Sequence, residues 1–309
     1  MVSKKLEQLG IYAFWVSDFE EGVNLRKAGI KTKIIVANAG MKSYEKIVKY
    51  NLDVVLYNNA LLHLYCSKKN PVNIHLKFNT GMNRYGFNPN MANSIVSKIQ
   101  NNCHLNLMSV CSHLAASDDR SKIDFSLKQI EKFISISKKV ELMLNEKIDK
   151  HILNTHGVLN FLKHQMNSVR LGIGIYGSAS DSNLRQIGSF FSVITQTRCL
   201  EKGEPIGYGC SFYAKEKIKI AIIPVGYADG LNRKLSNNVG SVFINNCKCP
   251  IVGEISMDSF AANITECGAQ EGDLVEIFGE NIAVSEIAKK INTIPYEIYS
   301  TLNRRIKRV

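Results

Sequence analysis

Polar side chains that can bind ligands or move protons follow several apolar runs of strand length. Lys77 ends one run, Arg84 lies in the glycine-containing turn after it, and His113 follows a second run. Each has an ordinary explanation, because long cations usually lie in water and a lone histidine is more often a hydrogen-bonded core residue. In a parallel (β/α) barrel, however, the carboxyl ends of the strands face the active site. The pattern predicts that these side chains converge at one mouth of a barrel.

A second group of candidates follows further along the same part of the chain. Asn154 and Thr155 end another apolar run, and Arg170 precedes a glycine-rich stretch that begins with Gly172 and Ile173. The glycines can be ordinary turn residues, but backbone amides free of side chains at a strand end also suit a phosphate group. These residues are therefore candidates for the same mouth.

The most specific motif surrounds Tyr227. It reads Gly-Tyr-Ala-Asp-Gly from residue 226 to residue 230 and follows a β run. Asp and Gly can simply set a bend. Tyr227 is also a candidate base, although a free tyrosine has a pKa of about 10 and needs neighbouring groups to help it lose its proton at neutral pH. A later turn reads Ser256-Met257-Asp258.

Up to about residue 180, the helices and strands that must position these residues are expected to alternate along the chain. Apolar runs alternate with stretches of helical period, which is the pattern of βα units around a parallel sheet. Asp18 is expected to cap a helix that Gly29 ends. Ser121–Leu144 is expected to form the longest helix, with an apolar face made of Ile123, Leu127, Ile130, Ile134 and Val140. The expected strands are Tyr12–Val16, Lys33–Ala37, Asp53–Tyr57, Asn73–Phe78, Asn106–Cys111, His151–Asn154 and Ser168–Leu171. Because a closed barrel has eight strands, these seven predict an α/β fold over residues 1–180, a (β/α)8-type barrel that lacks its first strand.

The alternation of expected strands and helices ends at about Ser180. Runs rich in β-forming residues, separated by turns that contain Gly and Asn, predict a smaller, mainly β domain over residues 181–309. The expected runs include Phe191–Cys199, Ile218–Ile223, Ser241–Ile244 and Leu274–Phe278.

Composition narrows the class of protein. Lys and Arg number 39 against 27 Asp and Glu, but the charge is spread and no nucleic-acid-binding motif accompanies it, so we expect no nucleic-acid partner. The eight cysteines lack paired spacing, which favours reduced thiols, and no metal site is expected. No signal-peptide core or membrane-length apolar run is visible, which predicts a soluble, cytoplasmic protein without a membrane partner.

In their order and their residues, these motifs resemble the alanine racemase family from about Ser3 to the end of the chain. The resemblance implies pyridoxal 5′-phosphate (PLP) as cofactor and alanine as substrate. It assigns cofactor binding to Arg84, His113, Asn154, Thr155, Arg170, Gly172 and Ile173. It assigns substrate binding to Arg84 and Met257, and catalysis to Tyr227 and His113, with His113 and Arg170 as the groups that help Tyr227 lose its proton. It also makes Lys77 a candidate for carbamylation in support of Arg84.

The resemblance places the guanidinium of Arg170 against the pyridine nitrogen of the cofactor. Arginine does not give up its proton, so this contact leaves the pyridine nitrogen unprotonated. The ring then withdraws electrons less strongly, which suits simple racemisation better than transamination.

One residue of the family pattern has no match. The family carries a lysine at the end of a strand just before the helix that residues 1–9 resemble. That lysine forms a Schiff base with the cofactor and is the base on the D face. We therefore expect an N-terminal truncation or fragment that is inactive as it stands. A second departure is at Asn303, Arg304 and Arg305, where many members have a tyrosine against the phosphate; an arginine can replace it electrostatically.

The resulting hypothesis is an isomerase that exchanges the α-proton of alanine between two bases and supplies D-alanine for peptidoglycan. The resemblance also implies a homodimer, because Tyr227 and Met257 of one subunit complete the site of the other. Three alternatives remain: a racemase for another small amino acid, a barrel-type decarboxylase, and a non-catalytic homologue that binds PLP or a partner. The Gly-Tyr-Ala-Asp-Gly motif favours a racemase, and retention of Arg84, His113, Arg170 and Tyr227 together argues against a binding module.

Overall fold

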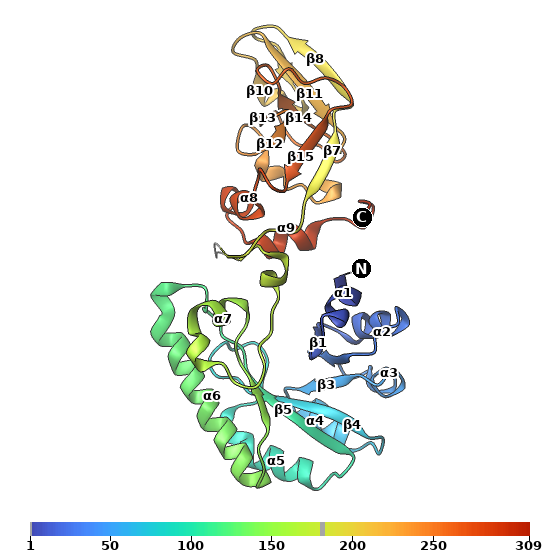
Figure 1. Ribbon diagram of the computed structural model, residues 1–309, viewed down its shortest axis with the longest axis vertical. Coiled ribbons are helices and arrows are strands. Elements are labelled where there is room, and N and C mark those ends of the chain that lie inside the picture. Colours follow the sequence, from blue (N-terminus) through green and yellow to red (C-terminus); the bar gives the residue numbers. More distant parts are fainter. Residues whose placement is uncertain (1, 180–182) are drawn as a thin grey trace. The chain divides into compact units, whose positions relative to one another are not determined.

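The computed structural model describes residues 2–179 and 183–309 (Figure 1). The chain forms two compact units, one ending at Leu171 and one running from Gly172 to Val309. The predicted domain boundary at residues 180 and 181 lies outside the described residues. Among the helices of the described ranges, none has both the length and the apolar character that a membrane span requires.

The first unit contains a six-stranded parallel sheet in which each strand pairs with the next in chain order. The strands are β1 (Ala13–Val16), β2 (Lys33–Val36), β3 (Asp53–Leu56), β4 (Val72–Lys77), β5 (Leu105–Cys111) and β6 (Asp149–His151). Helix α1 (Val2–Gln8) precedes β1, and helices connect the strands: α2 (Phe19–Lys27), α3 (Tyr44–Lys49), α4 (Asn59–Cys66), α5 (Ala92–Gln100) and α6 (Ile123–Leu144), with α7 (Thr155–Phe161) after β6. The predicted α/β architecture is confirmed.

The expected seventh strand is not formed. Ser168–Leu171 is irregular, although the backbone N–H of Arg170 donates to the carbonyl of Leu153 at 2.9 Å and that of Ser168 to the carbonyl of Lys150 at 3.4 Å. Two such bonds, one of them long, do not make a ladder, so the apolar pattern at 168–171 was wrongly read as a strand. The described part of the first unit therefore contains six strands where seven were expected, and the sixth is displaced: β6 spans Asp149–His151, so it shares only His151 with the expected His151–Asn154.

The helix boundaries follow local capping. The Asp18 side chain accepts a hydrogen bond from the backbone N–H of Glu21 at 3.0 Å, as an N-cap residue should, and Gly29 has a φ of +88° just after α2. The long helix α6 begins at Ile123 after a 3₁₀ turn over Arg120–Lys122. Of the residues expected along the apolar face of α6, Ile130 and Val140 are buried and Leu127 and Ile134 pack partly buried against the core, whereas Ile123 in the first turn is 43% exposed.

Alternation along the strands gives the sheet two different faces. Ile74 and Leu76 of β4 point into the large apolar core that the helices cover. His75 and Lys77, one residue out of phase, therefore belong to the opposite, inner face, where Cys111 is also buried. On this inner face the rings of Trp15 in β1 and His151 in β6 lie edge to face with centroids 5.5 Å apart, so side chains of the two edge strands of the sheet meet there.

The second unit is built around a seven-stranded antiparallel sheet with the order β7-β15-β12-β13-β14-β11-β8. Its strands are β7 (Phe190–Val193), β8 (Gln196–Leu200), β11 (Ile218–Ile223), β12 (Ser241–Ile244), β13 (Cys247–Val252), β14 (Phe260–Asn263) and β15 (Leu274–Phe278). A two-stranded sheet (β9, Pro205–Ile206; β10, Phe212–Tyr213) and helices α8 (Val284–Lys290) and α9 (Pro295–Thr301) complete it. The mainly β character is confirmed, but the run expected over Phe191–Cys199 divides into β7 and β8, at opposite edges of the sheet.

Asparagine occupies nearly all of the left-handed positions that are not glycine. In the described ranges nine non-glycine residues have positive φ, and all except Cys210 are asparagine. Asn245 and Asn246 form the two-residue connection between β12 and β13, with φ values of +45° and +63°. Positive φ at both positions matches the type I′ hairpin turn, in which asparagine is favoured.

Candidate active site

The guanidinium of Arg170 is the centre of the predicted site in the first unit. Its Nη2 donates to the carbonyls of Ser112 at 2.6 Å and Ile152 at 3.2 Å, and its Nη1 donates to the carbonyl of His151 at 3.3 Å. Nη1 also contacts Nδ1 of His151, and Nη2 lies 3.2 Å from Nδ1 of His113. The face of the Trp15 ring lies 5.1 Å from the guanidinium carbon. Strand ends and an aromatic ring therefore fix this cation from several sides.

One N–H donor of Arg170, at Nε, is not engaged by the protein residues that the structure describes. Both Nη atoms are engaged, whereas Nε has no hydrogen-bond partner in the part of the chain that the structure describes. Burial lowers the pKa of Arg170, but arginine remains a donor in proteins. The arrangement therefore presents a fixed N–H group that can bind an acceptor atom.

His113 is neutral in this environment. Burial, together with the positive charges of Arg170, Lys77 and Arg84, lowers the pKa of His113 to about 3. Its Nδ1 consequently has a lone pair that accepts from Nη2 of Arg170. The imidazole is thus held beside Arg170 as an uncharged ring.

Lys77 ends β4 on the same inner face and is only 8% exposed. Burial is the main cause of a lowered pKa of its amine, and Arg170 and Arg84 add to the effect while Cys111 opposes it. A lowered pKa increases the share of neutral amine. Lys77, Arg84, His113 and Arg170 are therefore close enough to influence one another electrostatically.

The loop that carries Arg84 is held by its own turn. The Asn79 side-chain oxygen accepts from the backbone N–H groups of Gly81 and Asn83, both at 3.0 Å. Gly86 has a φ of +132°, and a Cβ there would lie 2.5 Å from the backbone nitrogen of Asn79, so only glycine fits. Arg84 is exposed on this loop.

Asn154 and Thr155 begin α7. The side-chain oxygen of Asn154 accepts from the backbone N–H of Gly157 at 2.8 Å and from the hydroxyl of Ser117 at 2.7 Å. Asn154 is therefore an N-cap residue whose oxygen is engaged, and Thr155 is buried behind it.

The second unit contains the remaining candidates. Gly172 and Ile173 open it, and Ile173 is buried at the start of a 3₁₀ turn over Ile173–Tyr176. A Cβ on Gly172 would be 3.7 Å from Cε1 of Tyr296, so the glycine is not required by crowding. These residues lie in a different compact unit from the Arg170 cluster.

The tyrosine and methionine motifs lie side by side. The backbone N–H of Tyr227 donates to the carbonyl of Ser256 at 3.1 Å, and that of Ala228 to the carbonyl of Met257 at 3.0 Å. A Cβ on Gly226 would approach the carbonyl oxygen of Met257 to 2.2 Å, which explains the glycine before the tyrosine. Tyr227 and Met257 are 46% and 54% exposed, so both side chains are available to a ligand.

Sequence reasoning missed two residues with clear roles. Arg305, considered only as a phosphate ligand, instead donates to the carboxylates of Asp229 and Asp258. His151 was considered only as the first residue of an expected strand, and it proves to be a direct partner of Arg170. The alternation of His75 and Lys77 with apolar residues was the available signal that polar side chains face inward from the strands.

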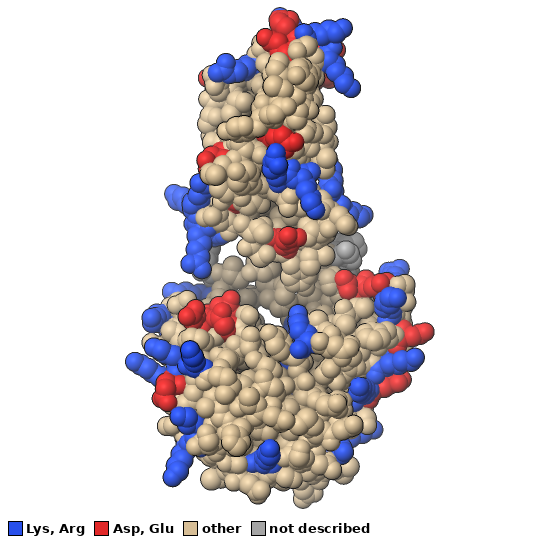
Figure 2. Space-filling view, turned by 180° about the vertical axis from the view of Figure 1, so that it is seen from behind, with Lys and Arg blue, Asp and Glu red and all other residues tan. Residues whose placement is uncertain are grey.

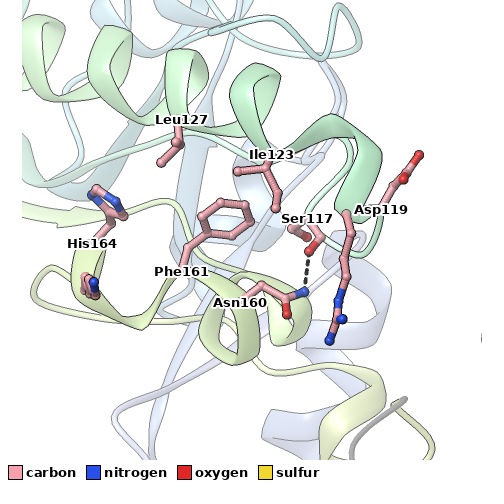
Figure 3. A pocket seen from close by; sticks show the side chains of 9 residues that line it. Ser117, Asp119, Ile123, Leu127, Asn160, Phe161 and His164 are labelled. Carbon is pink, nitrogen blue, oxygen red and sulfur yellow. Dashed lines mark hydrogen bonds between the residues drawn. The ribbon is translucent and has the colours of Figure 1, made fainter.

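A separate hollow of about 500 Å³ lies between α6 and α7 (Figure 3). Ile123, Leu127 and Phe161 form its apolar wall, and Asn160 donates from its side chain to the carbonyl of Ser117 at 2.8 Å. None of the predicted site residues lines it. On the face seen in Figure 2, Lys and Arg are interspersed with Asp and Glu and form no single basic patch. Within the described ranges, no group of three or more His, Cys, Asp or Glu residues could hold a metal ion.

Comparison with known proteins gives a consistent result over the whole chain. Residues 1–180 match the family model for the N-terminal domain of alanine racemase, and residues 187–309 match the model for its C-terminal domain. Alanine racemase 2 of Caldanaerobacter subterraneus is 33% identical over 100% of this chain and 83% of its own length. The alanine racemase of Fusobacterium nucleatum is also 33% identical, over 100% of this chain and 87% of its own.

Solved structures give the same picture. The alanine racemase of Clostridium difficile superposes with a TM-score of 0.91 at 28% identity, covering 100% of this chain and 84% of its own. The alanine racemase of Bartonella henselae, solved with covalently bound pyridoxal phosphate, has a TM-score of 0.89 at 27% identity, covering 98% of this chain and 86% of its own.

Proposed function

Because the chain belongs to the alanine racemase family of PLP-dependent enzymes, we propose that its residues bind PLP and alanine and exchange the α-proton that interconverts the L and D forms. The observation that carries this proposal is the fixed guanidinium of Arg170. Both Nη atoms are bound to protein acceptors, and among the residues that the structure describes only Nε is left to bind a ligand.

The residues present fit the cofactor. A pyridine nitrogen is an acceptor, and the Nε–H of Arg170 is an unengaged donor that cannot transfer its proton to it. Neutral His113 beside Arg170 offers an uncharged ring face, and Arg84 with Lys77 supplies positive potential. When bound, PLP withdraws electron density from the α-carbon of the amino acid, and an unprotonated ring does so moderately, which favours racemisation over transamination.

Tyr227 is the proposed base on the L face. Its loop is rigid, since the backbone of residues 227–228 is bonded to that of Ser256 and Met257, and its side chain is exposed for contact with substrate. We assign Met257, on the adjoining turn, to the substrate carboxylate. The opposite base is the lysine of the family pattern, which the motifs of this chain do not include.

We further propose a homodimer whose sites are shared between subunits. The Arg170 cluster belongs to the first compact unit, while Tyr227 and Met257 belong to the second and are exposed there. Sedimentation of an active enzyme as a monomer would contradict this assembly. Supply of D-alanine for peptidoglycan is the proposed role.

The test uses two proteins: the 309-residue chain, and the same chain joined to the N-terminal residues that precede the matched region in the Caldanaerobacter relative. We expect the joined protein to show PLP absorbance and to racemise alanine, and the 309-residue chain to do neither. Equal rates in both proteins would show that no upstream lysine is required.

Variants of the joined protein test the site itself. Tyr227→Phe should slow proton removal from L-alanine by roughly 10²- to 10⁴-fold, the usual contribution of a general base, and affect D-alanine less. Tyr213→Phe is the matched control, since Tyr213 is 56% exposed in the same unit. A joined protein that binds PLP firmly but racemises no small amino acid would instead be the non-catalytic homologue.

A further inference from the structure

A series of buried hydrogen bonds leads from a carboxylate to Arg170 across the inner face of the sheet. Oδ2 of Asp53 lies 3.3 Å from Nε2 of His75, and Nδ1 of His75 lies 2.6 Å from the hydroxyl of Ser109. That hydroxyl is 3.1 Å from Nε2 of His151, whose Nδ1 contacts Nη1 of Arg170. Each of four neighbouring strands, β3 to β6, contributes one member.

The two ends determine the direction of every hydrogen bond in the series. Arginine can only donate and an ionised carboxylate can only accept. Nδ1 of His151 therefore accepts from Arg170, so its proton is on Nε2 and is donated to Ser109. The Ser109 hydroxyl must then donate to Nδ1 of His75, whose Nε2–H donates to Asp53. One consistent arrangement of protons satisfies all four contacts.

Burial makes this arrangement costly to disturb. Asp53, His75, Ser109 and His151 are all at most 5% exposed, so water does not compete for their hydrogen bonds. The remaining oxygen of Asp53 accepts from the side-chain amide of Asn73 at 3.0 Å, which holds the carboxylate in place. The Trp15 ring contacts both His151 and Arg170 and confines them from another side.

We propose that Asp53, His75 and Ser109 are positioning residues that hold His151 as a neutral, Nε2-protonated imidazole and thereby fix the guanidinium of Arg170. The inference rests on the proposed function, because Arg170 is the residue assigned to the cofactor ring. Burial, Arg170, His75 and Lys77 all lower the pKa of His151 well below its usual value, which agrees with a neutral ring. A protonated His151 would have no lone pair for Arg170 and would repel it.

The need of a buried serine hydroxyl for a hydrogen-bond partner does not by itself explain why Ser109 lies between two histidines. Buried serines commonly bond to nearby backbone, as Ser137 does by donating to the carbonyl of Phe133 within α6 at 2.8 Å. Ser109 instead bridges two histidines on neighbouring strands. Ser109→Ala removes the bridge without changing charge, and Ser137→Ala is the control, because Ser137 is equally buried and lies outside the series.

The first measurement follows Arg170 directly, by ¹⁵N NMR of arginine- and histidine-labelled 309-residue chain without ligand. We expect the Arg170 side-chain N–H and the His151 Nε2–H to exchange slowly with water in the wild type and in Ser137→Ala, and at least about tenfold faster in Ser109→Ala. His75→Leu should act like Ser109→Ala. His75→Gln should restore slow exchange, because a carboxamide keeps one acceptor and one donor. Unchanged exchange in Ser109→Ala, or no difference between His75→Leu and His75→Gln, would overturn the inference.

The second measurement separates this inference from the proposed function, with pyridoxine 5′-phosphate as the calorimetric probe because it needs no lysine. A wild type that binds the probe and a Ser109→Ala variant that binds it about tenfold more weakly support both proposals. A wild type that fails to bind the probe contradicts the proposed cofactor site, whatever the exchange rates show. Equal affinity of Ser109→Ala and the wild type contradicts the positioning role.

Discussion

Arg305 donates two parallel hydrogen bonds to the carboxylate of Asp229, from Nε to Oδ1 at 2.6 Å and from Nη2 to Oδ2 at 2.9 Å. Nη2 also donates to Asp258 at 2.8 Å. Asp229 closes the turn of Tyr227, since its carboxylate accepts from the backbone N–H of Gly226 at 2.9 Å. The C-terminal arginine therefore ties together the two turns that carry the exposed Tyr227 and Met257.

This pairing predicts a pH-dependent contribution to stability. The hydrogen bonds from Arg305, helped by that from Gly226, hold the pKa of the Asp229 carboxyl below its usual value. Because the pKa of Asp229 is lower in the folded state than the unfolded-state pKa of about 3.9, the carboxylate stabilises the fold at pH values above about 3.9. This stabilisation is lost as the pH falls through the folded-state pKa. Arg305→Gln should lower the free energy of unfolding near pH 7, and the difference from wild type should shrink below about pH 4.

Denaturant unfolding at a series of pH values checks this. Arg308→Gln is the control, because Arg308 donates to the carbonyls of Leu302, Asn303 and Ile306 rather than to a carboxylate. Its effect should not shrink in acid. A difference for Arg305→Gln that is as large in acid as at neutral pH would show that the Asp229 carboxylate is not its main partner.

Gly226 should tolerate no side chain. Its added Cβ would lie 2.2 Å from the carbonyl oxygen of Met257, and the neighbour is backbone that cannot rotate away. Gly226→Ala should therefore cost about 1–3 kcal/mol or more and separate the Tyr227 and Met257 turns. Thermal or urea unfolding measures the cost. Gly203→Ala, at a φ of +88° with open space around it, shows what loss of glycine's backbone freedom costs without a clash.

Lys77 should react reversibly with carbon dioxide. Its neutral amine nitrogen forms a bond to the CO₂ carbon and releases a proton to solvent, giving a carbamate anion beside Arg84 and Arg170, whose charges favour it. Protein prepared in ¹³C-bicarbonate should show one carbamate signal that Lys77→Ala removes. Lys150→Ala should leave it, because the Lys150 ammonium is engaged with Glu141 at 2.7 Å. A signal that persists in Lys77→Ala would assign the modification elsewhere.

His113 should make the fold sensitive to mild acid. Its pKa falls from about 6.5 in the unfolded chain to about 3 in the folded one, chiefly through burial and then through Arg170. Between these values the unfolded state binds a proton that the folded state does not, so stability falls as pH is lowered through this window. The slope is at most about 1.4 kcal/mol per pH unit from this residue.

His113→Gln removes the titration and keeps an acceptor for Arg170, so the free energy of unfolding should depend less steeply on pH between about 6 and 4. His151, whose pKa is also lowered, contributes in the same direction and remains in the variant. An unchanged slope in His113→Gln would mean that His113 is protonated in the folded protein.

Much of the architecture could be predicted because its signals are local. The Asp18 cap, the strand before Lys77 and the change to β structure after about residue 180 follow from contiguous residue patterns. The strand expected at Ser168–Leu171 was wrong because strand identity depends on a ladder with a neighbour, and there only scattered bonds to β6 and the residues after it form. Ile123 belongs to the predicted face of α6 but is 43% exposed, because periodicity identifies the apolar face of a helix and not how far along the helix that face is buried.

In the site, too, local patterns could be predicted from the sequence and contacts between distant residues could not. The sequence motifs identified Arg170 and His113 as candidates, and the structure shows that their side chains are in contact. The partners Asp53, His75 and Ser109 carry no motif, and their connection depends on the register of three separate strand pairs. The pairing of Asp229 with Arg305 joins residues 76 positions apart, and no local pattern encodes it.

The asparagine turns have a consequence at the level of the gene. Eight of the nine non-glycine residues with positive φ in the described ranges are asparagine, including both residues of the hairpin between β12 and β13. Glycine would fit these positions, but every glycine codon begins with a pair of guanines, whereas asparagine codons contain none. Left-handed turns can therefore be kept at these sites as guanine is lost from the coding strand, so drift in base composition need not alter the course of the backbone.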